Sequence, residues 1–472
     1  MSDPIASIAA LDDQDDALIP RHATGEWQAL DAAHHFHPFT DTADLNRRGT
    51  RIFERAAGVY IYTTDGQKIL DGMSGLWCVN VGYGREELVA AAAAQMRRLP
   101  FYNSFFQCTH PPAIELSRRL AEIAPPHVNH VFFAGSGSEA NDTVVRAVRH
   151  YWASLGQPQR QVIVARRNAY HGSTMAGASL GGMAPMHAQG GLPIPGIVHI
   201  EQPYWFGVGR HHYPDPEAFG RAAAEWLREK ILELGPETVA AFIGEPVQGA
   251  GGVIIPPATY WPRIQQICDE FGILLVVDEV ICGFGRLGRW FGSEHYGLKP
   301  DLMPIAKGMT SGYLPMGGVL VSDRVAEVLI ERGGEFHHGF TYSAHPASCA
   351  VALANLRLLE EEKLIARVGE IAPYYRERWL ALGAHPLVGE ARTLGLVGAL
   401  ELVADKKTLT PFEKIGAAGT RCRDAAIKNG LVMRAVRDTM ITAPPFIVSY
   451  NQIDELADKA WQSLEDTARA LT

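Results

Sequence analysis

The sequence lacks the features of a disulfide scaffold, a membrane protein or a nucleic-acid-binding protein. Its six cysteines among 472 residues show neither CxxC spacing nor another regular framework, so we expect neither a disulfide network nor a zinc finger. No run of about 18 uninterrupted apolar residues occurs, which predicts no membrane-spanning helix and no membrane partner. With 43 Lys and Arg against 52 Asp and Glu, the net charge is −9, and no basic stripe suggests a nucleic-acid partner.

The first residues also lack the basic region and the apolar core of a secretory signal, so we expect a cytoplasmic protein in a reducing compartment. Hydrophobic residues make up 47% of the chain and charged residues 20%, as in a soluble globular protein with a large core. The length allows two or three domains, or one large domain with appendages.

The central part of the sequence places an acid and an amine at the ends of two apolar runs. Residues 273–277 read as a buried strand of a parallel sheet, and Asp278 follows directly. The next apolar segment, 301–306, is followed by Lys307. An amine in an apolar pocket can attack a carbonyl and form a Schiff base, and an acid can keep a pyridine nitrogen protonated. The pair suggests the cofactor pyridoxal 5'-phosphate (PLP), although each residue alone more often has a structural role.

A run of small residues suggests where a phosphate would bind. Residues 131–134 read as a strand, and the Gly- and Ser-rich stretch 135–142 leads into a helix that extends to about residue 155. Free backbone N–H groups and the helix dipole at such a helix start attract an anion. The stretch has neither the Lys-Ser/Thr pair of a P-loop nor the GxGxxG motif of a dinucleotide site. The sequence therefore argues against binding of a nucleoside triphosphate or of a dinucleotide there.

Two further predicted strands end in polar or aromatic residues. Residues 162–164 precede Tyr170 and His171, and residues 239–243 precede Glu245. Tyr170 could stack on a flat ring, while the alternative is a structural loop residue. Open α/β sheets bind ligands at the carboxyl ends of their strands. The phosphate cradle, the aromatic residue, two acids and one lysine at successive strand ends therefore favour a PLP site.

Two more features have competing interpretations. Trp77 lies in a Gly-rich loop, and the sequence alone favours a core position over a pocket wall. His34, His35 and His37 invite a metal interpretation, but no ligand pattern such as HExxH accompanies them. A loop that presents aromatic surface is favoured there, and no metal site is predicted.

The rest of the chain alternates predicted helices and short strands. A hairpin with an Asp-Gly turn is expected at 58–71, and a Gly- and Pro-rich excursion at 181–216 is expected to form a pocket rim or subunit contact. The remaining predicted elements are helices at 25–33, 86–99, 113–124, 216–235 and 347–362, a strand at 397–403 and an edge segment at 431–434.

The sequence resembles the class III aminotransferases of the PLP-dependent aspartate aminotransferase superfamily, in particular the (S)-selective ω-transaminases, or amine:pyruvate aminotransferases. The resemblance runs from His37 to about Ile453. It is carried by the motifs Asp71-Gly72-Met73-Ser74-Gly75-Leu76-Trp77, Tyr170-His171-Gly172-Ser173-Thr174, Gly244-Glu245-Pro246, Val277-Asp278-Glu279-Val280-Ile281-Cys282-Gly283-Phe284-Gly285-Arg286 and Ala306-Lys307-Gly308.

This resemblance implies an α/β protein of PLP-dependent fold type I (aspartate aminotransferase-like), with a large mostly parallel sheet domain plus a smaller α+β domain. An N-terminal segment, 1–84, would contribute to the small domain. Residues 85–345 would form the large PLP-binding domain, and residues 346–472 the C-terminal small domain.

The resemblance also implies the roles of the catalytic residues. Lys307 would bind PLP as a Schiff base and then shuttle a proton between substrate and cofactor. Asp278 would pair with the protonated pyridine nitrogen. Tyr170 would stack on one face of the ring, and Val280 would pack against the other.

The phosphate site follows from the same resemblance. Ser136 and Gly137 would bind the phosphate with help from Thr341 of a second subunit, and Glu245 would support the polar side of the ring. Many relatives have Asn before the Ser-Gly pair, where this chain has Ala134-Gly135, a change that bears on the affinity for PLP.

The substrate pocket is implied as well. Arg434 matches the family's mobile arginine, which pairs with a carboxylate and swings away for an apolar amine. The implied aromatic and apolar walls are Leu76, Trp77, Tyr170 and Phe105, with Phe39 and Phe106 from the second subunit. For Trp77 this reverses the preference for a core position.

The implied reaction is a ping-pong transfer of an amino group from a primary amine or ω-amino acid to pyruvate or a similar keto acid, in a homodimer or dimer of dimers with shared active sites. The same cofactor would also serve a diamine, taurine or β-alanine:pyruvate aminotransferase, an aminomutase, or an α,α-dialkylglycine decarboxylase. Two functions outside this group stay open, namely a non-enzymatic PLP-binding module and a hydrolase with a metal at His34, His35 and His37.

Overall fold

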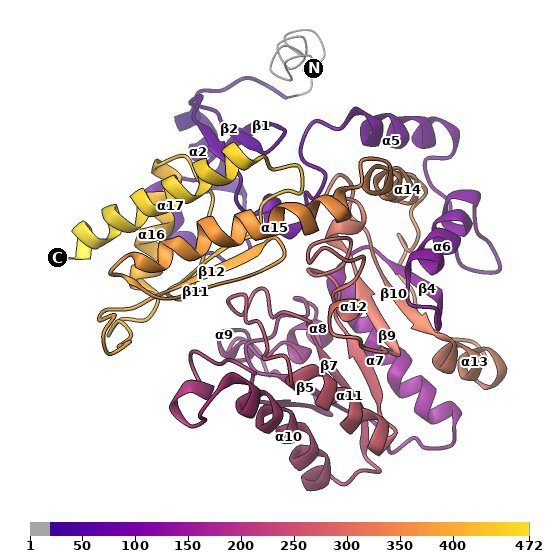
Figure 1. Cartoon of the computed structure of the whole chain (residues 1–472). Coiled ribbons are helices and arrows are strands. Elements are labelled where there is room, and N and C mark those ends of the chain that lie inside the picture. Colours follow the sequence, from indigo (N-terminus) through magenta and orange to yellow (C-terminus); the bar gives the residue numbers. More distant parts are fainter. Residues whose placement is uncertain (1–18, 472) are drawn as a thin grey trace.

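A seven-stranded mixed sheet forms the middle of the computed structural model, which describes residues 19–471 (Figure 1). β10 is antiparallel to both of its neighbours, and the other pairs are parallel. β4, β5, β7, β8 and β9 therefore all end at the same edge of the sheet. In spatial order the strands are β4 (Val128–Ala134), β10 (Gly317–Ser322), β9 (Leu302–Ile305), β8 (Leu274–Val277), β7 (Val239–Gly244), β5 (Val162–Arg166) and β6 (Ile197–Ile200).

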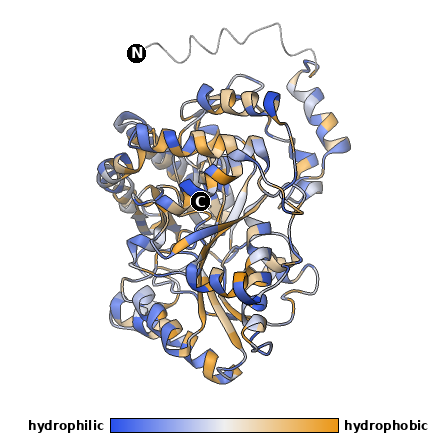
Figure 2. Cartoon of the chain, turned by 90° about the vertical axis from the view of Figure 1, so that its right-hand side faces the viewer, coloured by the Kyte–Doolittle hydropathy of each residue, from blue (hydrophilic) through white to orange (hydrophobic). Residues whose placement is uncertain are grey.

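Helices cover both faces of this sheet because successive strand residues point to opposite sides. Ile163 and Ala165 of β5 pack in one core with α7 (Gly137–Ser154), whereas Val164 packs in another core with α10 (Pro216–Leu234) and α11 (Tyr260–Phe271). All residues of β7 and β8 are buried, as expected for strands covered on both faces. Figure 2 shows orange, hydrophobic strand residues in the interior of the molecule and a mixture of orange and blue on the surrounding helices.

Two smaller sheets lie beside the large one and touch each other. The first contains β1 (Phe53–Ala57), β2 (Tyr60–Thr63) and β3 (Lys68–Leu70). The second has the order β11 (Val388–Leu394), β12 (Val397–Leu402), β14 (Thr439–Thr442) and β13 (Arg434–Val436). Leu70 bonds through its backbone to Gly430 and Val432, each at 2.9 Å, so the N-terminal sheet joins the C-terminal part of the chain.

The remaining helices surround these sheets (Figure 1). They are α2 (Thr24–His34), α3 (Thr42–Arg48), α4 (Ser74–Trp77), α5 (Glu86–Arg98), α6 (Pro111–Ile123), α8 (Met175–Leu180), α9 (Ala184–His187), α12 (Gly292–His295), α13 (Asp323–Arg332), α14 (Pro346–Glu361), α15 (Leu364–Ala381), α16 (Ala417–Lys428) and α17 (Tyr450–Leu471). Within residues 19–471, no helix is both long and apolar enough to cross a membrane.

The predicted fold class is confirmed: a large, mostly parallel sheet is accompanied by a smaller α+β part. The hairpin at 58–71 and the five predicted helices are present with small differences at their ends. The division into segments 1–84, 85–345 and 346–472 stays a prediction. The first of these segments includes residues 1–18, which lie outside the described range. The prediction that no signal sequence is present concerns the same residues.

Two strands of the large sheet differ from the predictions. The excursion at 181–216 contains the edge strand β6, whose residues Ile-Val-His-Ile are only half buried. β10 was not predicted, and it is the strand that turns a parallel sheet into a mixed one. At 431–434 only Arg434 belongs to a strand, while Leu431 makes an isolated bridge to Leu70.

Candidate active site

A cavity of about 360 Å³ lies at the edge of the sheet where these strands end, and most of the predicted cofactor residues line it. The loops after β4, β5, β7, β8 and β9 each contribute to its wall. The lining residues include Leu76, Ser136, Gly137, Tyr170, Glu245, Asp278, Val280 and Lys307, together with Cys78, Asn141 and His171.

Lys307 lies two residues after the end of β9 and begins a short 3₁₀ turn, Lys307–Met309. Its φ of 43° is unusual for a residue other than glycine, and it turns the chain sharply away from the strand direction. Burial lowers the pKa of its ammonium group, while the neighbouring Cys78, Asp278 and Glu245 act in the opposite direction. A lowered pKa increases the fraction of neutral amine, which is the nucleophilic form.

Asp278 follows β8 and is held by three hydrogen bonds. Its Oδ2 accepts from Nδ1 of His171 at 2.7 Å and from Nδ2 of Asn141 at 2.9 Å, and its Oδ1 accepts from the Val280 N–H at 3.0 Å. Burial alone would raise the pKa of this carboxyl group, but His171 and the amide donors outweigh burial and lower it. Asp278 is therefore a buried, ionised carboxylate.

Asn141 is a site residue that the sequence analysis missed. It lies on α7 one turn after Gly137, so it faces the same cavity, and it also donates to the His171 carbonyl oxygen at 2.9 Å. Its position four residues after Gly137, in the helix that follows the predicted phosphate cradle, was the sequence signal that could have identified it. Nε2 of His171 is buried and has no hydrogen-bond partner among the described residues.

The start of α7 has the geometry of an anion site. Ser136 is the N-cap, and its Oγ accepts from the Glu139 N–H at 3.2 Å, while the Glu139 carboxylate accepts from the Gly135 N–H at 2.6 Å. The first N–H groups of a helix have no partner within the helix, so they remain available to an anion. A Cβ at Gly137 would lie 3.2 Å from the Val280 side chain, which shows how closely the two loops approach.

Glu245 and Tyr170 form one unit at the ends of β7 and β5. The Glu245 carboxylate accepts from the Tyr170 N–H at 3.2 Å and from the Gly249 N–H at 2.9 Å. Burial raises the pKa of Glu245, with the charge of Asp278 acting in the same direction and that of His171 opposing it. The acid therefore fixes the backbone that carries the Tyr170 ring.

The predicted substrate residues lie on the side toward the smaller sheets. The Arg434 guanidinium lies over the Trp77 ring at 5.2 Å, and Trp77 itself is buried. Leu76 and Arg434 both line a neighbouring cavity of about 790 Å³. Phe39 belongs to the same chain as Tyr170, and their rings are 6.1 Å apart. Phe39 can therefore approach Tyr170 within one chain, and its contribution from a second subunit stays a prediction.

Phe105 and Thr341 do not reach the cofactor cavity of their own chain. Phe105 lines a separate cavity with Phe132 and Gly339, and Thr341 is exposed. Phe106, next to Phe105, is 90% exposed. Any role of these three residues in the site requires a second copy of the chain.

The residues of the cavity fit PLP. The start of α7 suits its phosphate, the ionised Asp278 suits a protonated ring nitrogen, and the amine of Lys307 lies in the same cavity. Nε2 of His171, whose ring bonds to Asp278 through Nδ1, is a buried polar atom without a hydrogen-bond partner among residues 19–471.

Comparisons with known proteins agree with this geometry. Residues 44–464 match the family model "Aminotransferase class-III". Putrescine–pyruvate aminotransferase of Pseudomonas aeruginosa is 62% identical over 449 residues, which cover 95% of this chain and 98% of that protein. Vanillin aminotransferase of Capsicum chinense is 42% identical over 424 residues, which cover 89% of this chain and 92% of that protein.

Solved structures show the same fold. The (S)-enantioselective ω-transaminase of Thermomicrobium roseum superposes with a TM-score of 0.92 at 42% identity, covering 95% of this chain and all of that one. The ω-transaminase of Pseudomonas jessenii in complex with PMP superposes with a TM-score of 0.92 at 39% identity, covering 94% of this chain and 98% of that one. The chain has fold type I and the PLP dependence of its relatives, and it belongs to the class III aminotransferases.

Proposed function

We propose that the protein is an ω-transaminase that moves the amino group of a primary amine to pyruvate by a ping-pong mechanism. The observation that carries this proposal is the cavity in which Lys307 and Asp278 meet the start of α7. The names of the relatives, putrescine–pyruvate aminotransferase and ω-transaminase, support the choice of amine and acceptor.

Lys307 and Asp278 divide the chemical work. PLP, when bound, supplies an electron sink that stabilises negative charge on the substrate carbon. Lys307 would hold the cofactor through Nζ, and after the substrate amine displaces it, the freed Nζ would take the proton from the carbon that carries the amino group. Asp278 would keep the proton on the ring nitrogen, and His171 and Asn141 keep its carboxylate oriented.

The remaining cofactor contacts position the ring. Ser136 and Gly137 at the start of α7 would hold the phosphate, and Tyr170 and Val280, which line the same cavity, would pack against the ring. Glu245 acts through the Tyr170 backbone that it binds. Thr341 reaches the phosphate only from a second copy of the chain, because it is exposed in its own.

The substrate side combines an apolar wall with one cation. Leu76, Phe39 and Tyr170 would contact the apolar part of an amine, and Arg434, which lies over the buried Trp77, would bind the carboxylate of pyruvate. Arg434 is suited to both substrates, because its guanidinium can stack on Trp77 when no carboxylate is present.

A homodimer, or a dimer of dimers, is part of the proposal. Phe106, Tyr342 and Thr341 are each exposed in the single chain, and a second copy would cover them. Six free cysteines support a reducing, cytoplasmic location. Light scattering after size exclusion would test the assembly, and a monomer at working concentration would contradict it.

A second candidate donor is a diamine, which the 62% identity to putrescine–pyruvate aminotransferase favours. The purified protein should show the visible absorption band of lysine-bound PLP. The band should bleach with (S)-1-phenylethylamine or with 1,4-diaminobutane, and it should return with pyruvate.

The rate of bleaching ranks the donors. A much faster reaction with 1,4-diaminobutane would assign the protein to diamines, and a faster reaction with the aryl amine would assign it to apolar amines. A band that neither amine bleaches would contradict the proposed function, and absence of the band after PLP is supplied would contradict the cofactor site.

A further inference from the structure

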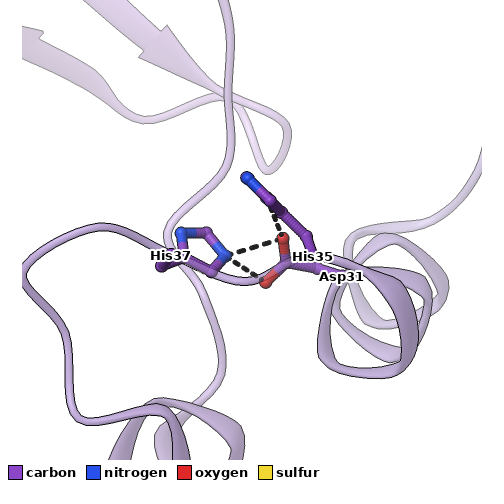
Figure 3. Close-up of side chains that lie close together, drawn as sticks. All are labelled: Asp31, His35 and His37. Carbon is purple, nitrogen blue, oxygen red and sulfur yellow. Dashed lines mark hydrogen bonds and ion pairs between the residues drawn. The ribbon is translucent and has the colours of Figure 1, made fainter.

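Asp31, His35 and His37 form a cluster of possible metal ligands outside the candidate active site (Figure 3). Asp31 lies in the last turns of α2, His35 is the C-cap one turn later, and His37 follows two residues on. One ligand atom from each of the three residues lies within 4.8 Å of the others. Figure 3 shows the carboxylate of Asp31 bonded to both imidazole rings.

The spacing of the ligand atoms is close to that of a tetrahedral metal site. Nε2 of His37 lies 2.9 Å from both carboxylate oxygens of Asp31, and Nδ1 of His35 lies 3.1 Å from Oδ1. Zinc–ligand bonds of about 2.0–2.1 Å at tetrahedral angles separate the ligand atoms by roughly 3.3 Å. A cation therefore requires each histidine nitrogen to move away from the Asp31 carboxylate by a few tenths of an ångström, and the two imidazole rings, whose centroids are 4.1 Å apart, to separate so that both nitrogens point at the ion.

The carboxylate already has the outer support that metal ligands require. The hydroxyl of Thr50 donates to Oδ2 of Asp31 at 2.6 Å, and Gln28 of α2 donates to the Thr50 carbonyl oxygen at 3.0 Å. The Thr50 hydrogen bond is the largest cause of a lowered Asp31 pKa, since it favours the ionised form. Hydrogen bonds of this kind orient ligands and tune affinity in metal sites.

We propose that Asp31, His35 and His37 bind one divalent transition-metal ion of the zinc type. Ions of this type bind well to two imidazole nitrogens and one carboxylate oxygen, whereas Mg²⁺ and Ca²⁺ prefer oxygen ligands alone. Three protein ligands leave at least one coordination position for water. The imidazole of His35 is 62% exposed, so the ion can enter directly from solvent.

The site lies on the segment that leads to the substrate pocket. His37 is two residues before Phe39, whose ring is 6.1 Å from that of Tyr170. Phe39 is 73% exposed, so few contacts of its own hold it. A cation that ties His37 to the end of α2 would therefore also restrict the position of Phe39.

The competing explanation is a metal-free cluster in which the two histidines only donate hydrogen bonds to Asp31. Both explanations use the same three residues, but they predict different results when a cation is added. A hydrogen-bonded cluster gives no stoichiometric, saturable cation site that depends on both imidazoles. The measurement must therefore compare variants rather than only detect metal.

The test uses the PLP-loaded enzyme without a polyhistidine tag, after dialysis against a chelator. Zn²⁺ is titrated by calorimetry, and Co²⁺ is titrated by visible absorption, which reports tetrahedral coordination. We expect one site per chain that the double substitution His35→Gln/His37→Gln weakens by about 100-fold or more. Thr50→Val, which removes only the outer hydrogen bond, should weaken it by roughly 10- to 100-fold.

His34→Gln is the matched control, because His34 is an exposed neighbour outside the cluster. It should bind Zn²⁺ as the wild type does. His35→Gln alone serves if the double variant does not fold, since its exposed side chain makes few packing contacts. Equal Zn²⁺ affinity in the wild type and in the His35 variants would overturn the proposal, as would an equal loss in His34→Gln.

Discussion

Removal of the Arg434 guanidinium should impair the reaction with pyruvate far more than the reaction with an aryl-alkyl amine. Arg434 begins β13 and lies over the Trp77 ring, and among the described residues no carboxylate forms an ion pair with it. Burial lowers its pKa, although it remains a cation at neutral pH. A substrate carboxylate would supply the anion that this buried charge lacks.

The size of the effect follows from the bonds that are lost. A hydrogen bond to a charged group contributes about 1.5–3 kcal/mol, and about 1.36 kcal/mol corresponds to a factor of ten. Arg434→Ala should therefore lower kcat/KM for pyruvate by about 10- to 150-fold. Loss of the contact with Trp77 affects both half-reactions, so the ratio of the two changes isolates the carboxylate contribution.

In a ping-pong reaction, kcat/KM for each substrate reports its own half-reaction, so initial rates at varied pyruvate and varied (S)-1-phenylethylamine separate the two effects. Arg434→Lys keeps the charge but loses the paired N–H groups, and it should give an intermediate loss. Arg437→Ala, an exposed cation three residues away, is the matched control. Equal losses on both substrates would refute a carboxylate-binding role for Arg434.

Three further substitutions test the site and its support. Lys307→Met should abolish turnover and covalent PLP, so mass spectrometry after borohydride reduction should find no cofactor on the peptide that contains residue 307; a labelled peptide elsewhere would contradict the assignment. His171→Asn removes the 2.7 Å bond to Asp278 and should weaken PLP retention during dialysis, whereas unchanged retention and rate would show that Asn141 alone suffices. Burial raises the pKa of Glu279 from 4.5 to about 7, so the folded state keeps a proton that the unfolded state releases between these pH values, and stability falls as the pH rises through this window. Relative to Glu279→Gln, the wild type should lose on the order of 3 kcal/mol from pH 4.5 to 7, measured by denaturant unfolding, and parallel pH curves would contradict this.

The large sheet could be predicted where its strands are buried on both faces. β7 and β8 are continuous apolar runs, and a parallel sheet covered by helices on both faces accommodates such runs. β6 could not be found this way because it is an edge strand with half-buried residues after a Gly- and Pro-rich stretch. β10 pairs antiparallel with β4 and β9, and its place between them depends on contacts far apart in the sequence.

The same contrast applies to the candidate site. Asp278 and Lys307 closely follow apolar strands, so their meeting at one edge follows from the parallel arrangement. The approach of Arg434 to Trp77 joins residues that are far apart in the chain, and only the resemblance to a family suggested it. Asp31 was missed beside His35 and His37 because a search for sequence motifs such as HExxH does not cover a carboxylate one turn earlier.

Under the proposed function, reaction and substrate choice rest on different parts of the chain. The cofactor residues lie at the edge of the large sheet, whereas Leu76, Trp77 and Arg434 lie in or beside the smaller sheets. The buried Arg286 joins these parts, because it donates to Oδ1 of Asn80 and to the Pro444 carbonyl oxygen, each at 2.6 Å. The loop that carries Leu76 and Trp77 is thus fixed to the segment after β8 that begins with Asp278. Under the proposed function, substitutions within that loop would change the accepted amine while Lys307 and Asp278 stay in place, so relatives named for different substrates can share one reaction centre.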